Sequence, residues 1–161
     1  LGFSKTVGKF TEYDGYFSFD EKKPEDSKID VSLKPAGIKT SSDALDKHLQ
    51  SADFFNTEKF PDIKFVSKSI KVTGEKTGEV TGDVTMLGVT KPVVLKVTFN
   101  KLGVHPKTQD TVAGFSAEAT IKRSEFGMVY GIGMVGDDVK LVIETEGVNM
   151  DKKTQPMGKK N

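Results

Sequence analysis

Alternation of apolar and polar residues, with a period of two, runs through most of the 161-residue chain. Successive side chains of a β-strand point to opposite faces, so this alternation predicts strands with one buried and one solvated face. Segments rich in glycine, proline or aspartate separate the runs, as expected of turns. The pattern predicts an all-β, antiparallel protein. The clearest runs lie at residues 29–33, 63–72, 80–87, 93–100, 113–121 and 139–144.

The segment 7–20 is also strand-like, but Asp14-Gly15 interrupts it. A tight hairpin and one strand bent at the glycine both fit this pattern. We favour the bent strand, because the two halves would be short for a hairpin. Counted once, the segment brings the chain to about seven long strands. An up-and-down barrel needs an even number for antiparallel closure, so we expect an eighth strand before Leu1.

One helical insert interrupts the strands, at about residues 42–57. Ser42 is a suitable N-cap, and Leu45 and Leu49 lie four residues apart on one face. A helix of about eight residues is too short to be stable alone, so it must dock on the sheet. No helix can continue through Phe60-Pro61. The insert therefore covers either a core or a ligand.

Composition excludes several function classes. The formal net charge of +1 argues against electrostatic binding of nucleic acid, which needs a concentrated basic face. The chain has no cysteine, which excludes disulfides and thiol catalysis. No apolar run is long enough for a transmembrane helix. We predict no cofactor.

Gly131, Gly133 and Gly136 form a formal G-x-G-x-x-G match. Dinucleotide binding requires a strand before this motif and a helix after it, with the helix N-terminus facing the phosphates. Here a strand pattern follows, so we interpret the segment as a flexible turn.

Metal binding and catalysis have little support in the sequence. The only histidines, His48 and His105, are far apart, whereas zinc sites need several ligands at short spacing. A carboxylate-assisted site at Asp43, Asp46 and His48 is conceivable, but a histidine on a helix surface is the simpler interpretation. Ser116 does not lie in a nucleophile elbow, and no carboxylate pair stands out. We predict a protein that is not an enzyme.

Phenylalanine is the informative residue type, with eleven copies and no tryptophan. The strand pattern places Phe65, Phe99 and Phe115 on inward faces, together with either Phe10 or the pair Phe17 and Phe19. A packed core is the default explanation of such a face. However, alanines on 113–121 and an inward Gly82 leave volume to be filled. An eight-stranded barrel can hold side chains or one small ligand, so both remain open.

Several ordered motifs extend this picture over about residues 1–149. They include HLQSADFF at 48–55, FPDIKF at 60–65, the strand–turn–strand at 80–93, the segment 113–127 and GDDVKL at 136–141. In this order the chain resembles the YceI family, the lipocalin-like polyisoprenoid-binding proteins of bacteria. Members of that family usually carry an earlier strand, which is absent from this sequence.

The resemblance implies a lipocalin-like antiparallel barrel of about eight strands, with one domain at 1–149 and a polar, basic tail at 150–161. It also implies an exported, commonly periplasmic protein that binds a long isoprenoid, quinone or fatty-acid-like lipid in an apolar tunnel, and that can form homodimers. The alternatives are an accessory protein for quinone-linked redox or isoprenoid processing, and an interaction module with a filled core. We predict that the ligand contacts Phe10, Phe17, Phe19, Phe54, Phe55, Phe65, Val84, Met86, Phe99, Phe115, Ala117 and Phe126.

Overall fold

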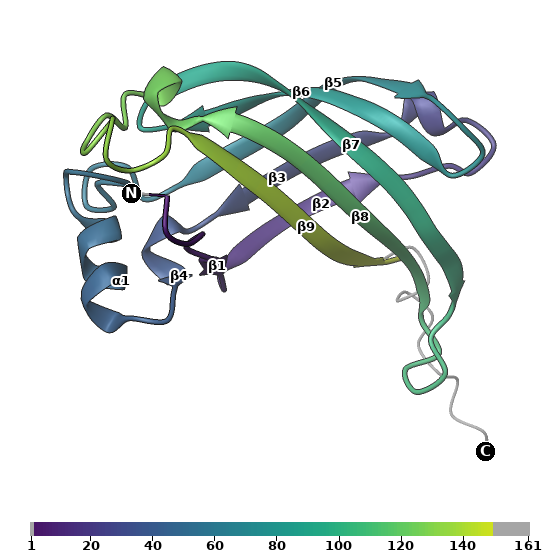
Figure 1. Cartoon of the computed structure of the whole chain (residues 1–161). Coiled ribbons are helices and arrows are strands. Elements are labelled where there is room, and N and C mark those ends of the chain that lie inside the picture. The colour runs from purple at the N-terminus through teal and green to yellow at the C-terminus, as the bar shows by residue number, and fades with distance from the viewer. Residues whose placement is uncertain (1, 150–161) are drawn as a thin grey trace.

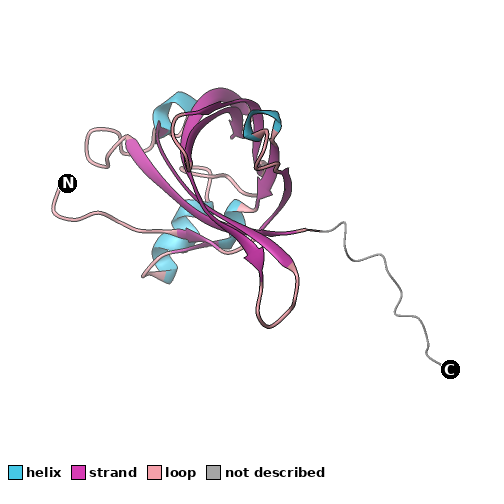
Figure 2. Ribbon diagram, turned by 90° about the vertical axis from the view of Figure 1, so that its right-hand side faces the viewer, coloured by secondary structure: helices cyan, strands magenta, loops and turns pink. Residues whose placement is uncertain are grey.

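The computed structural model describes residues 2–149. Seven antiparallel strands form its main sheet, and each pairs with the next along the chain. The sheet curls on itself into a half-barrel (Figures 1 and 2). This architecture confirms the predicted all-β, antiparallel fold class. The strands are β2 (Tyr13–Ser18), β3 (Lys28–Leu33), β5 (Ile63–Val72), β6 (Thr77–Met86), β7 (Val89–Val104), β8 (Thr111–Lys122) and β9 (Asp138–Val148).

The N-terminal segment differs from the prediction. It is neither one bent strand nor a hairpin, because β1 (Lys9–Phe10) pairs with β4 (Ile38–Lys39) in a separate small sheet. The break falls at Thr11-Glu12, whereas Gly15 lies in regular register opposite Val31. A Cβ at Gly15 would lie 2.5 Å from the carbonyl oxygen of Asp30. The glycine therefore permits close approach of β2 to β3 and does not bend the strand.

The only α-helix among the described residues is α1 (Asp43–Gln50), as the sequence predicts. Ser42 caps it by accepting a hydrogen bond from the Leu45 N–H at 3.4 Å. The rest of the insert, to residue 59, forms turns. Short 3-10 helices are η1 (Pro24–Asp26), η2 (Pro35–Gly37) and η3 (Arg123–Phe126). Within residues 2–149, no helix has the length and apolar character to cross a bilayer.

The half-barrel has two unlike ends (Figure 1). We call one the helix end, because α1 and the connection from η3 to β9, residues 123–137, lie there. We call the other the hairpin end, because the β7–β8 hairpin around residues 104–111 projects from it. Every strand of the main sheet runs between these ends, so each inward side chain can be assigned to one of them.

The first and last strands of the main sheet, β2 and β9, do not pair with each other. In an antiparallel meander of seven strands they run in the same direction, so they cannot form an antiparallel pair directly. Side chains bridge them instead, because the ring of Phe17 on β2 packs against Gly147 on β9. The predicted strand before Leu1 and the predicted tail at 150–161 lie outside the described residues.

Candidate functional site

Much of the inner face is buried toward the helix end. Val84 and Met86 of β6 and Val93 and Leu95 of β7 are each at most 8% exposed, and partly buried apolar residues such as Ile63, Phe65 and Val89 pack against them. Phe126 of η3 is 1% exposed and belongs to the same cluster, as does Ala117 of β8. The alternation of the sequence places these side chains on one face, and η3 covers them. This end is a packed core.

Phe54 joins the packed core from the insert, as the sequence suggested. Its ring is 8% exposed and lies 5.0 Å from the ring of His48 and 5.4 Å from that of Tyr130, between centroids. Nε2 of His48 lies 2.9 Å from a carboxylate oxygen of Asp53, which orients the imidazole. Phe55 lies apart from this group, against Phe10 of β1 at 5.6 Å. Phe10 therefore packs on the insert, away from the other inward phenylalanines.

A second aromatic group occupies the inner face toward the hairpin end. The ring of Phe115 on β8 lies 5.2 Å from Phe17, 5.0 Å from Phe19 and 5.5 Å from Phe99, between centroids. Phe19 also lies 5.1 Å from Phe99. All four side chains are only half-buried. We call these residues the phenylalanine cluster; they come from β2, β7, β8 and the segment after β2.

Two glycines on the inner face, Gly82 and Gly147, are each covered by a phenylalanine ring. A Cβ at Gly82 would lie 2.5 Å from the ring of Phe65, so that ring already fills the space over the glycine. Phe17 covers Gly147 in the same way. The volume that the sequence left open at Gly82 is therefore filled by a protein side chain, because the cross-strand register sets the Phe65 ring beside it.

The turn with the formal G-x-G-x-x-G match is held in place by Arg123, a role that the sequence analysis missed. The guanidinium is 4% exposed and donates to four backbone carbonyls. These belong to Met128, Tyr130, Val135 and Gly136, at 2.9–3.1 Å. Its Cζ also lies 6.0 Å from the centroid of the Phe54 ring. The segment forms turns, as the sequence predicts, and these bonds hold its backbone in place.

Two carboxylates at the helix end, Asp46 and Asp137, accept hydrogen bonds that hold neighbouring segments in place. Asp46 is 3% exposed and accepts hydrogen bonds from the backbone N–H and Oγ1 of Thr40, both at 2.7 Å. The Thr40 hydroxyl, foremost, holds the pKa of Asp46 below its ordinary value. Asp137 accepts from the N–H and hydroxyl of Ser124, and its pKa is likewise lowered. Within residues 2–149, no three His, Asp or Glu side chains gather as metal ligands.

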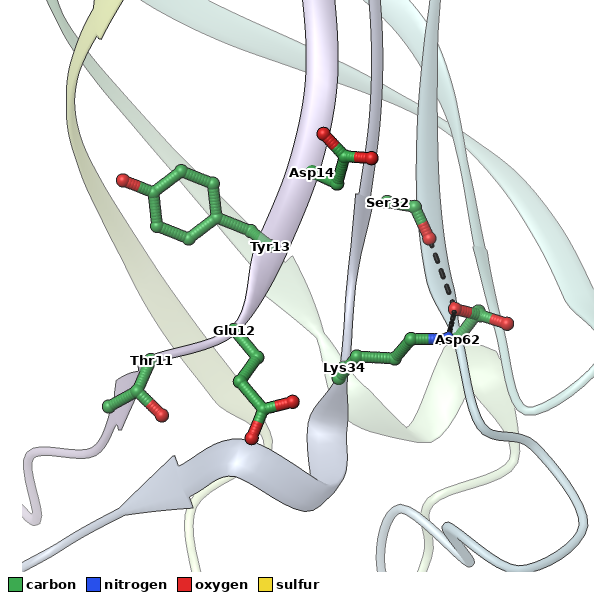
Figure 3. Close-up of a pocket in the computed structure, with 7 residues that line it drawn as sticks. All are labelled: Thr11, Glu12, Tyr13, Asp14, Ser32, Lys34 and Asp62. Carbon is green, nitrogen blue, oxygen red and sulfur yellow. Dashed lines mark hydrogen bonds and ion pairs between the residues drawn. The ribbon is translucent and has the colours of Figure 1, made fainter.

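Two surface hollows are lined mainly by polar and charged residues. One, of about 450 Å³, lies between the start of β2 and the end of β3 (Figure 3). There Lys34 forms an ion pair with Asp62 at 2.6 Å, which lowers the pKa of Asp62. The other, of about 380 Å³, lies beside α1. The predicted ligand-contacting residues line neither hollow.

Comparison with known proteins identifies the class. A curled antiparallel sheet with one short helix fits a lipocalin-like barrel. Residues 1–147 match the model of the YceI-like domain, and the chain belongs to this family. The resemblance seen in the sequence is thus confirmed.

Sequence relatives and solved structures agree with this family. A UPF0312 protein of Pseudomonas putida strain F1 is 49% identical over 148 residues, covering 92% of this chain and 76% of that protein. A YCEI protein of Campylobacter jejuni is similar in structure, with a TM-score of 0.85, 33% identity, and coverage of 92% of this chain and 88% of the other. BcnA of Burkholderia cenocepacia shares the fold, with a TM-score of 0.79 at 23% identity and coverage of 87% and 86%.

Proposed function

We propose that this protein binds a long-chain isoprenoid or a similar amphiphilic lipid against the inner face of its half-barrel. In this proposal it is a carrier or sequestering protein of the periplasm, without enzymatic activity. The family resemblance, which implies polyisoprenoid binding, favours this ligand class. The phenylalanine cluster is the observation that carries the proposal.

Half-buried aromatic rings on an inner face are unusual, because packed interiors bury such rings fully. The four rings of the phenylalanine cluster keep part of their surface exposed, whereas Phe126 at the helix end keeps almost none. Covering that remaining surface with a lipid tail removes apolar area from water, at about 25 cal/mol per Å². A tail lying along these rings would therefore be bound without any charged contact.

The guest would enter from the hairpin end or between β2 and β9, and not from the helix end. Phe54, Phe126 and Met128 close the helix end and are each at most 8% exposed. On β9, Ile143 pairs with Ala117 and so shares its inward face, yet it is 37% exposed. The inner surface is thus open to solvent along the β9 edge.

Organic extraction of the purified protein followed by mass spectrometry tests the proposal. We expect a lipid with a long apolar chain, and we expect Phe115→Ala to reduce its yield, since Phe115 lies at the centre of the cluster. Phe60→Ala is the matched control, because Phe60 is also half-buried but packs outside the cluster, against Gly88. Reproducible absence of lipid, or equal yields from both variants, would contradict the proposal.

A second candidate, an interaction module with a filled core, is favoured by the rings of Phe65 and Phe17 over Gly82 and Gly147. Ala117 is 8% exposed and lies in the packed core, so Ala117→Phe should destabilise the protein by about 1–3 kcal/mol in either case. Lipid extraction separates the two candidates, because only a lipid carrier yields lipid from the wild type and loses it in this variant.

A further inference from the structure

The connection from η3 to β9 exposes an apolar surface at the helix end. Met128, at its start, is 5% exposed and belongs to the core. The residues that follow turn outward, although water is a poor solvent for their side chains. We call residues 129–135 the apolar loop. Its exposed side chains are Val129 (60%), Tyr130 (47%), Ile132 (46%), Met134 (63%) and Val135 (48%).

The backbone of the apolar loop is hydrogen-bonded within the protein. Besides the carbonyls that Arg123 holds, the N–H of Ile132 donates to Val129 O at 3.2 Å. The N–H groups of Met134 and Val135 donate to Gly131 O at 3.0 and 2.8 Å. Gly131 and Gly133 adopt φ values of +62° and +95°, which favour glycine and permit these tight turns. The carbonyls of Val129, Tyr130, Gly131 and Val135 and three N–H groups of the loop are thus paired within the protein.

We propose that the apolar loop inserts into the surface of a lipid bilayer. Pairing backbone polar groups within the protein lowers the cost of placing a loop in lipid. Arg123 and the turn bonds pair several of these groups, and the side chains that face outward are those that partition into lipid. Tyr130 suits the boundary, since tyrosine is enriched where membrane meets water. Its ring is fixed against Phe54 and His48.

The charges beside the apolar loop favour apolar insertion over attraction to anionic lipid. Lys122 is paired with Asp138 at 2.9 Å, and Asp137 is bonded to Ser124. The cations Lys122 and Arg123 stand beside the carboxylates of Glu125, Asp137 and Asp138, so these groups carry no positive excess that would attract anionic lipid. We therefore expect binding to neutral phosphatidylcholine vesicles that persists at high salt, because screening weakens only electrostatic attraction.

Single-tryptophan variants give a direct test, because the natural chain contains no tryptophan. Val129→Trp places the probe on the apolar loop. Val104→Trp is the matched control, since Val104 is 62% exposed but lies at the hairpin end. With phosphatidylcholine vesicles we expect a blue shift of the emission of Val129→Trp and its quenching by brominated lipid. The emission of Val104→Trp should not change.

Substitution with glutamate completes the test with full-length protein. Val129→Glu should weaken co-sedimentation with phosphatidylcholine vesicles about tenfold or more, whereas Val104→Glu should behave as the wild type. Circular dichroism of each variant shows whether it is folded. The proposal is overturned if folded Val129→Trp shows no blue shift, or if the two tryptophans respond alike. It is also overturned if binding requires added phosphatidylglycerol. Lipid extraction is a separate readout, so failure here leaves the proposed lipid carrier intact.

Discussion

The two ends of the half-barrel use aromatic side chains in opposite ways. At the helix end, Phe54 and Phe126 are buried beneath the insert and the connection from η3 to β9, and Arg123 fixes that connection. At the hairpin end, the phenylalanine cluster stays half-buried on the same inner face. Both ends derive from the same alternating pattern. What separates them is the cover: the insert and the connection from η3 to β9 close the helix end, whereas the short connection from β2 to β3, with η1, leaves the cluster half-buried.

The largest predicted effect is the loss of stability on removing an aromatic ring at the helix end. Phe126→Ala should lower the free energy of unfolding by about 3–5 kcal/mol, because it removes a fully buried ring and leaves a cavity. Phe99→Ala, in the half-buried cluster, should cost clearly less, since part of its surface is already exposed to water. Urea unfolding of both variants measures the difference. Equal losses would mean that the two ends are packed alike.

The second-largest loss of stability is expected on removing the Arg123 guanidinium, which holds the connection from η3 to β9. Arg123→Met should cost about 2–4 kcal/mol, because a buried carbonyl that loses its donor costs about 1–3 kcal/mol and the connection can partly open to water. Lys122→Met is the neighbouring control, since Lys122 is exposed and paired with the exposed Asp138. We expect little change in its unfolding curve. Hydrogen exchange should accelerate at Ile132 and Val135 in Arg123→Met alone, and uniform acceleration would contradict a local role.

The sequence predicts which strand residues face inward, because the alternation of apolar and polar residues assigns each of them to one face of the sheet. The run 113–121 correctly placed Phe115 and Ala117 inward, and Ser42, Leu45 and Leu49 located α1. Contacts that depend on register were not predictable. That Phe65 covers Gly82 follows only once β5 is aligned with β6.

The role of Arg123 was also hidden. Arg123 binds backbone carbonyls, which every residue carries. No side-chain motif in the sequence can therefore predict these hydrogen bonds. The available signal was compositional: Val129, Ile132 and Val135 are apolar residues in a segment that reads as a turn. Such residues in a turn indicate either a buried connection or a contact surface.

Adding a methyl group at an inner-face glycine should cause a smaller loss of stability. The loss should be larger at Gly82 than at Gly147. Gly82→Ala should cost about 1–3 kcal/mol, because the new Cβ meets both the Phe65 ring and the carbonyl oxygen of Val66 at 2.6 Å. The atoms nearest to a Cβ at Gly147 all belong to the ring of Phe17, which can turn away at the open edge of the sheet. We expect a smaller loss of stability there, with reduced lipid yield on extraction. The reverse order of stabilities would show that β2 and β9 are the more tightly packed pair.

The smallest predicted effect is a dependence on pH at the helix end. The pKa of Asp46 is lowered in the folded protein, so its ionised form contributes stability above the ordinary aspartate pKa of about 3.9. That contribution is lost as the pH falls through the lowered folded value. Asp46→Asn should therefore be less stable than the wild type at pH 7, and the difference should narrow below about pH 4.

Thr40→Val tests the cause of this dependence, because it removes the hydroxyl that donates to Asp46 at 2.7 Å and retains the side-chain shape. The pKa of Asp46 should then rise toward its ordinary value, and the pH dependence of unfolding should flatten. In the double variant with Asp46→Asn, the effect of Thr40→Val at pH 7 should shrink, since the ionised acceptor is gone. Strictly additive losses at pH 7 would show that the two side chains stabilise the helix end independently.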